Sequence, residues 1–185
     1  MVARPEVNFR DEDLLKAIGE SAPEKIIDFF SKRVKFEETV HPMLHYSAVP
    51  YDLSQCNSTL QLIPERIIQK VREWFDTDKT LFTYRGGGLI KVIFPEPDKQ
   101  ILAELGKLVA VGTKENCEFV IQVLNSYNGN EVTHDLYKEI IDSLPLDSDL
   151  ISEISCGLDS EGVVRGEFGY VATYLRKKAE IEPWL

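Results

Sequence analysis

Residues 22–30 have the sequence APEKIIDFF, and a similar opening recurs as IPERIIQKV at 63–71 and as EPDKQILAEL at 96–105. Each segment places a proline before an acidic residue, a basic residue and a pair of apolar residues. Proline suits the first turn of a helix because its missing N–H has no acceptor there, and an acidic side chain is favoured at the positive end of the helix dipole. The three segments therefore predict three helix starts of one design. Their prolines, at 23, 64 and 97, are 41 and 33 residues apart, which suits units of two helices.

Apolar residues recur every three or four positions through most of the chain, as in Ile67, Val71 and Trp74. This spacing puts them on one face of a helix, and no stretch shows the sustained alternation of a half-buried strand. Helices are predicted near 11–19, 22–38, 63–76, 97–111, 114–127, 131–144 and 167–182, with two less regular ones near 81–93 and 147–157. The predicted fold is all-α, with antiparallel helix pairs in a single domain spanning residues 1–185. Residues 39–59, which contain HPMLHYSAVPYDLSQCNST, are predicted to be an irregular insertion.

Composition limits the classes of partner and the compartment. The 185 residues are 43% apolar and carry a formal net charge of −10, with no dense basic block. Such a surface repels phosphate backbones, so nucleic acid is not expected as the primary partner. No apolar run approaches the ~18 residues that span a bilayer, and the first residues lack the apolar core of a secretion signal, so no membrane association is expected. Three widely separated cysteines do not form a disulfide framework and favour a cytoplasmic protein.

Helix pairs with a period in the thirties and a proline near the helix start resemble the HEAT and armadillo-like α-solenoids. The resemblance extends over residues 11–182, and the glycine triplet at 86–88 and the insertion depart from it. It implies a curved stack that binds another macromolecule along one face without chemistry of its own. The segment GVVRGEFGYVATYLRKKAEIEPWL, at 162–185, is similar to the ends of HEAT-like regions in larger bacterial proteins. Its final Trp184 and Leu185 either fold back on the preceding helix or are followed by more chain in the natural protein.

The glycine triplet Gly86, Gly87 and Gly88 stands between Arg85 and an apolar run containing Lys91. A phosphate-binding P-loop needs Ser or Thr after its lysine, and a dinucleotide fingerprint needs a third glycine where Lys91 stands, so both motifs are incomplete. The favoured interpretation is that the glycines let a helix begin late or let a neighbour approach closely, despite a cost of ~1 kcal/mol for each interior glycine. Anion binding by Arg85 and exposed backbone N–H groups remains the alternative.

Potential metal ligands and nucleophiles do not complete a known motif. His41 and His45 with Cys56 beyond lack further ligands at a zinc spacing, and Pro42 favours a turn between the histidines. The remaining candidates are an isolated histidine, two cysteines on or near apolar stripes, and an acidic cluster without the order of a calcium loop: His134, Cys117, Cys156, Asp147, Asp149, Glu153, Asp159 and Glu161. No catalytic, cofactor-binding or metal-binding residue is predicted, and the chain is not expected to be an enzyme.

Aromatic residues near loops are the remaining candidates for contact with a partner. Tyr46 and Tyr51 lie in the insertion and Tyr84 precedes Arg85, whereas Trp74 fits the apolar stripe of its own helix and is expected in the core. Tyr and Arg contribute disproportionately to interfaces when exposed. The predicted function is a non-catalytic scaffold that binds a protein of unknown identity through these residues and the three glycines. The alternative is a regulatory domain for a small ligand or anion, or an enzyme, with a cleft near Arg85 and the glycine triplet.

Overall fold

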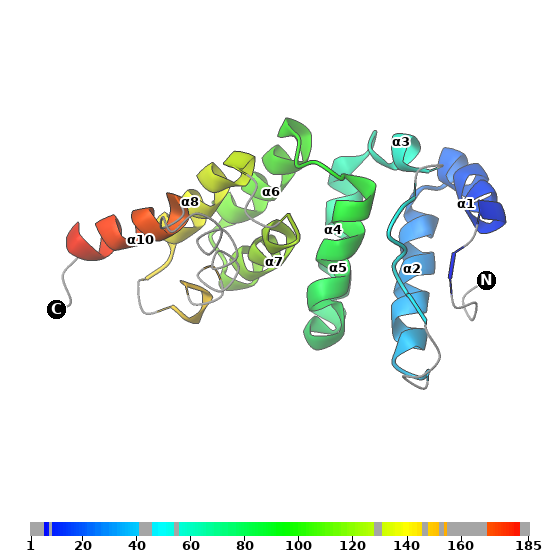
Figure 1. Ribbon diagram of the computed structural model, residues 1–185, viewed down its shortest axis with the longest axis horizontal. Helices are drawn as coiled ribbons and strands as arrows, with labels where there is room; N and C mark the ends of the chain where they lie inside the picture. The colour runs from blue at the N-terminus through cyan, green and yellow to red at the C-terminus, as the bar shows by residue number, and fades with distance from the viewer. Residues whose placement is uncertain are drawn as a thin grey trace. The chain divides into compact units, whose positions relative to one another are not determined.

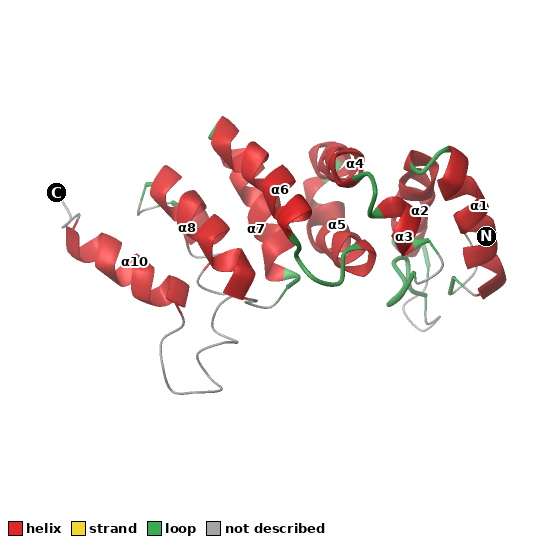
Figure 2. Cartoon of the chain, turned by 90° about the horizontal axis from the view of Figure 1, so that it is seen from above, coloured by secondary structure: helices red, strands yellow, loops and turns green. Residues whose placement is uncertain are grey.

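The computed structural model describes residues 6–7, 9–40, 46–53, 56–127, 131–145, 148–151, 154 and 170–181. These residues form helices and loops and contain no strand, which confirms the all-α prediction for this part of the chain (Figures 1 and 2). None of the helices in these ranges is both long enough and apolar enough to cross a bilayer. The chain divides into two compact units, Met1–Glu96 and Pro97–Leu185, and each is described by itself. The single-domain organisation stays a prediction.

The first unit contains five helices among the described residues: α1 (Phe9–Ser21), α2 (Glu24–Glu37), α3 (Asn57–Leu60), α4 (Pro64–Thr77) and α5 (Lys79–Ile93). Consecutive long helices pack against one another, α1 on α2, α2 on α4, and α4 on α5. Their apolar stripes meet in a core whose members are fully buried, including Ile27, Phe30, Ile67, Val71 and Leu89. Trp74 is also buried, as predicted. Burying these stripes is the main stabilisation available to helices of this length.

The helix starts follow the proline-led segments. Pro64 occupies the first turn of α4, and Pro23 immediately precedes α2. The third segment differs, because the helix begins at Lys99 and the carboxylate of Asp98 caps it, accepting the N–H groups of Gln100 and Ile101 at 2.9 and 3.0 Å. The prolines thus mark three helix starts, although in three slightly different positions.

The insertion differs from the prediction at its C-terminal end. Residues 39–59 were expected to be irregular throughout, but the short helix α3 begins at Asn57. Asn57, the first residue of α3, and Gln61, which follows its last residue, hold the end of α5, since their side-chain amides donate to the carbonyls of Val92 and Ile93 at 3.0 and 2.6 Å. The last carbonyls of a helix have no intrahelical donor, so these bonds satisfy them. Residues 46–53 form an extended segment that runs alongside α2 and is hydrogen-bonded to it through Arg33 and Glu37 (Figure 1).

The second unit contains α6 (Lys99–Val111), α7 (Lys114–Asn125), the single 3₁₀ turn η1 (Glu131–Thr133), α8 (His134–Ser143) and α10 (Tyr170–Ile181). Gly112 ends α6 in the left-handed conformation, with φ 73°, which glycine adopts without strain. The helix α10 packs on α8, where the Lys178 ammonium donates to the carbonyls of Ile141 and Leu144 at the end of α8. This contact satisfies the negative end of the α8 dipole.

The predicted helix ranges agree with the observed ones to within about three residues, including the less regular helix near 81–93, which is α5. For the predicted helix near 167–182, both ends lie outside the described residues. The predicted helix near 147–157 lies mostly outside the described residues, although positions 149–151 and 154 are helical. Cys156, Asp147, Glu153, Asp159 and Glu161 also lie outside them.

Candidate functional site

The glycine triplet lies in the interior of α5. The helix begins at Lys79, so the proposal that the glycines delay its start is wrong. The backbone N–H groups of an interior helical turn donate to carbonyls four residues earlier, which leaves them unable to cradle an anion. Close approach explains Gly86, because a Cβ atom there would lie 2.8 Å from Cγ1 of Val71 in α4.

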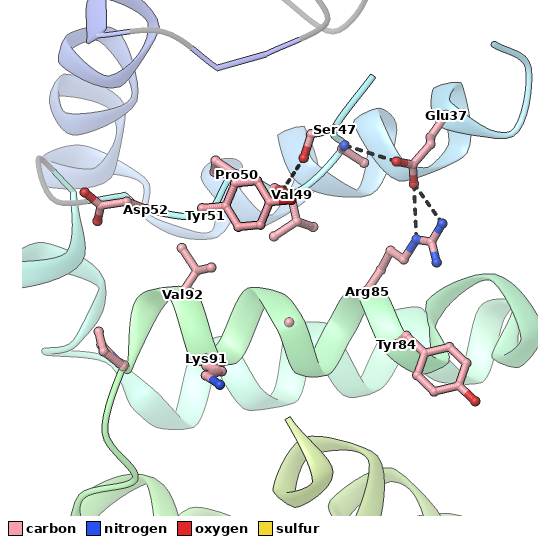
Figure 3. A pocket seen from close by; sticks show the side chains of 13 residues that line it. Glu37, Ser47, Val49, Pro50, Tyr51, Asp52, Tyr84, Arg85, Lys91 and Val92 are labelled. Carbon is pink, nitrogen blue, oxygen red and sulfur yellow. Dashed lines mark hydrogen bonds and ion pairs between the residues drawn. The ribbon is translucent and has the colours of Figure 1, made fainter. Parts of the chain in front are cut away.

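Gly88 has a different environment. A Cβ atom at Gly88 would have no neighbour within 4 Å, and the residue borders a cavity of about 520 Å³ between α5 and the extended segment of the insertion. We call this cavity the α5 groove (Figure 3). One side is formed by residues 47–52 and the other by one face of α5, where Tyr84, Arg85, Gly88, Lys91 and Val92 recur at helical spacing.

A buried arginine fixes the segment side of the groove. Arg33 in α2 is 0% exposed, and its guanidinium donates from Nε to the carbonyl of Ala48 at 2.9 Å and from Nη2 to the carbonyl of Ser47. Its Cζ also lies 4.7 Å from the centre of the Tyr46 ring. A buried charge is tolerated only when it is well hydrogen-bonded, so Arg33 and the backbone of residues 47–48 stabilise each other.

The surroundings of this arginine perturb two ionisable groups. Burial lowers the pKa of the Arg33 guanidinium from its ordinary value, while Tyr46, Asp11 and Glu37 nearby oppose that shift. Burial raises the pKa of the Tyr46 phenol, and the positive charge of Arg33 works against this rise. Both side chains therefore have a structural role beside the groove, and Tyr46 is packed against Phe36 with ring centres 5.4 Å apart.

A second arginine crosses the groove. Nε and Nη2 of Arg85 both lie 3.1 Å from Oε2 of Glu37, while Oε1 of Glu37 accepts the N–H of Ala48 at 3.3 Å (Figure 3). Glu37 thus links α5 to the extended segment. The Arg85 side chain is 40% exposed, so its remaining N–H donors stay accessible to solvent.

Two tyrosines flank this arginine on the surface. Tyr51 is 99% exposed and Tyr84 is 74% exposed, and both line the α5 groove. The structure therefore gathers four of the predicted partner-binding residues, Tyr51, Tyr84, Arg85 and Gly88, around one cavity. The other three do not line it: Tyr46 stacks on Arg33, and Gly86 and Gly87 are buried.

Sequence reasoning missed Glu37, Lys91 and Arg33. Nothing in the sequence links Glu37 to Arg85, which is 48 residues away. Lys91 had a signal, because Tyr84, Gly88 and Lys91 are spaced by four and three residues and so share a helix face. Arg33 also had one, since it falls on the apolar stripe of its helix and a charge there needs buried partners.

The other candidates do not form a chemical site. His41 and His45 lie outside the described residues. Cys56 is 0% exposed, and burial raises the pKa of its thiol to about 11, so the nucleophilic thiolate is scarce at neutral pH. Cys117 is buried as well, and His134 is half-buried at the start of α8. Across the described ranges, no three His, Cys, Asp or Glu side chains are placed to hold a metal ion together.

Comparison of the chain with protein-family models, curated proteins and solved structures found no match. The resemblance to HEAT-like repeats therefore stays a prediction.

Proposed function

We propose that this chain is a non-catalytic protein-binding module and that the α5 groove is its contact surface. The observation that supports this proposal is the pair of exposed tyrosines beside the groove. Among the large apolar side chains exposed in the described part of the chain, the aromatic ones are Tyr51 and Tyr84. The tyrosine side chain offers a large apolar ring with a hydroxyl group that can hydrogen-bond to a partner, and tyrosine and arginine dominate the energetics of protein interfaces.

The rigidity of the groove also favours binding of a macromolecular segment. Glu37 and Arg33 hold the extended segment in place by hydrogen bonds to residues 47–48, so the groove is formed before a partner arrives. A preformed surface loses little conformational entropy on binding. The predicted HEAT-like arrangement of helix pairs would also favour a protein partner, because α-solenoids commonly bind proteins along one face. The net charge of −10 disfavours nucleic acid as the partner. The thiols of Cys56 and Cys117 are buried and free of disulfide bonds, which supports an intracellular location.

A small ligand or anion is the second candidate, because the cavity of about 520 Å³ falls in the size range of small-molecule sites. Arg85 is the group that would hold such an anion. The exposure of Tyr51 and Tyr84 favours the protein partner instead, since residues that enclose a small ligand are normally less exposed.

Photo-crosslinking tests the proposal directly. Benzoylphenylalanine replaces Tyr51, Tyr84 or, as the control, Leu62, which is 80% exposed but lies outside the groove lining. Each protein is irradiated in an extract of its source cells. We expect positions 51 and 84 to give the same protein adduct and position 62 to give none of it. Absence of an adduct from both tyrosine positions, or an equal yield from position 62, would contradict the proposal.

The small-ligand alternative has its own readout. Thermal unfolding of the purified protein is followed with a panel of small carboxylates and phosphates, alongside the variant Arg85→Gln. Stabilisation of the wild-type protein that is lost in this variant, combined with no adduct at positions 51 and 84, would favour the alternative.

A further inference from the structure

We infer that the α5 groove binds an extended segment of a partner protein whose backbone crosses α5 at Gly88 and which carries an acidic side chain next to an apolar one. This inference rests on the proposed function and names the chemistry of the partner. Its starting point is that the three glycines of α5 do not share one explanation.

Packing inside the protein requires a glycine at position 86 but not at position 88. A side chain at Gly86 would collide with Val71, whereas a Cβ atom at Gly88 would meet nothing within 4 Å. Glycine is among the poorest residues for a helix interior, so a helix gains nothing from it where space is available. A glycine does allow another backbone to approach a helix closely. At Gly88 the free space belongs to the groove, which indicates that the approaching group comes from another molecule.

The side chains around Gly88 define what that molecule must offer. Val92 on α5 and Val49 and Pro50 on the opposite side supply apolar surface (Figure 3). For the partner, an extended peptide fits this groove better than a helix does. Adjacent side chains of an extended peptide point in opposite directions, and so toward the two sides of the groove. An apolar side chain of the partner would pack against Val49 and Pro50, while the side chain next to it in sequence would point toward α5.

The charges on α5 select the second side chain. Lys91 lies three residues after Gly88 and Arg85 lies three residues before it, so each is almost one turn away. Lys91 has no acidic partner among the described residues. The acid of the groove nearest Arg85 is Glu37, whose two oxygens are already engaged by Arg85 and the N–H of Ala48. The charge of Arg85 is therefore already balanced by Glu37, although the remaining N–H donors of Arg85 are exposed, so Lys91 is the cation on the α5 face that an acidic side chain of the partner would meet. Asp52, on the side of the groove formed by residues 47–52, repels an acidic side chain of the partner, and this repulsion fixes the orientation in which the partner peptide binds.

The test is a selection of displayed random peptides on the immobilised full chain, followed by affinity measurements with synthetic versions of the enriched peptides. We expect the enriched peptides to share an acidic residue beside an apolar one. Their affinity should fall about tenfold or more for Gly88→Leu, which fills the groove from α5, and similarly for Lys91→Glu. The matched controls are Gly106→Ala and Lys99→Glu, which lie outside the groove and should bind as the wild-type chain does.

Folding is checked independently by circular dichroism, and Gly88→Leu should give the helical spectrum of the wild-type protein because a Cβ atom at this position has no neighbour within 4 Å and the rest of the side chain enters the groove. Enriched peptides without an acidic residue, equal binding to Gly88→Leu, or failure to enrich any peptide would overturn the inference. The inference would also be overturned if the wild-type chain formed a concentration-dependent dimer and Gly88→Leu abolished it. The groove would then be occupied by a second copy of this chain.

These outcomes are separate from those of the proposed function. If crosslinking at Tyr51 and Tyr84 captures a protein and Gly88→Leu leaves that adduct unchanged, the partner binds the surface without crossing Gly88. The inference then fails while the proposed function stands. If neither tyrosine gives an adduct, the proposed function fails first.

Discussion

Alanine at Gly86 and at Gly88 should change the stability of the protein in opposite directions, although the two positions are two residues apart in one helix. Alanine is better than glycine in a helix interior by about 0.8–1.0 kcal/mol. At Gly88 nothing opposes this gain, because the new methyl group has no neighbour within 4 Å. We therefore expect Gly88→Ala to raise the free energy of unfolding by about 1 kcal/mol.

At Gly86 the same gain is opposed by a steric clash. The new methyl carbon would lie 2.8 Å from Cγ1 of Val71, against about 3.5–4.0 Å for an ordinary carbon contact. Val71 is 0% exposed and β-branched, so its side chain has little freedom to turn away. Overpacking a core costs about 1–3 kcal/mol. After subtracting the helix gain, we expect Gly86→Ala to lower the free energy of unfolding by up to about 2 kcal/mol.

Urea unfolding followed by tryptophan fluorescence measures both changes. Trp74 is buried in α4 and lies 5.2 Å from Phe82 between ring centres, so it reports on the first unit. Trp184 is replaced by phenylalanine in every variant so that it adds no signal. Val71→Ala supplies the control, because in that background the cost of Gly86→Ala should shrink by about 1 kcal/mol or more. Equal changes at the two glycines, or no coupling between Gly86 and Val71, would refute the reasoning.

Three further predictions concern contacts elsewhere in the two units. Arg33→Lys should lower the free energy of unfolding by about 2–3 kcal/mol, because lysine cannot reproduce the hydrogen bonds to the carbonyls of Ser47 and Ala48. Since these bonds hold the extended segment in place, chymotrypsin should cleave the variant faster after Tyr46 and Tyr51. The thiol of Cys56 has a folded-state pKa of about 11 against an ordinary value of 9.0, so its contribution to stability is fully present below pH ~9 and is lost as the pH rises through 11. By pH 10.5 the wild-type chain should therefore lose about 2 kcal/mol more than Cys56→Ala, as measured by urea unfolding across the pH series. Lys178→Met should destabilise the second unit by about 1–2 kcal/mol in thermal unfolding, because the carbonyls of Ile141 and Leu144 lose the charged donor and Ile141 keeps only the N–H of Leu144. Lys177→Met, at an exposed neighbouring position, should have little effect.

The helices could be predicted from the sequence because their signals are local. Apolar spacing and proline-led starts need only a few neighbouring residues, and both are present around Pro23 and Pro64. The short helix α3 was missed because the four residues Asn57–Leu60 are too few to show a period. Its first residue, Asn57, and the residue that follows it, Gln61, donate to the carbonyls at the end of α5, and these are tertiary contacts.

The site was predictable only in part, for the same reason. Four residues that border the α5 groove were selected from their chemistry, but the groove itself depends on contacts that are distant in sequence. The bond between Arg85 and Glu37 joins residues 48 positions apart, and the segment side of the groove depends on Arg33 reaching residues 47–48. No local pattern encodes such a pairing. The arginine on an apolar stripe did require a buried acceptor, but it did not specify which backbone would supply it.

The glycine triplet shows how one local motif can meet two unrelated requirements. Residues in a helix are rotated by about 100° per position, so Gly86 and Gly88 face nearly opposite directions, about 160° apart. One of these directions is occupied by Val71 of α4, and the other opens on the groove. Because neither Gly86 nor Gly88 has a side chain, α5 is narrower on two opposite faces. The α4 helix packs closely against one of these faces, and space remains beside the other. Packing against α4 explains the glycine at position 86 but not the one at position 88. The third glycine of the triplet therefore indicates a contact made outside the first unit, which is the contact that we assign to a partner protein.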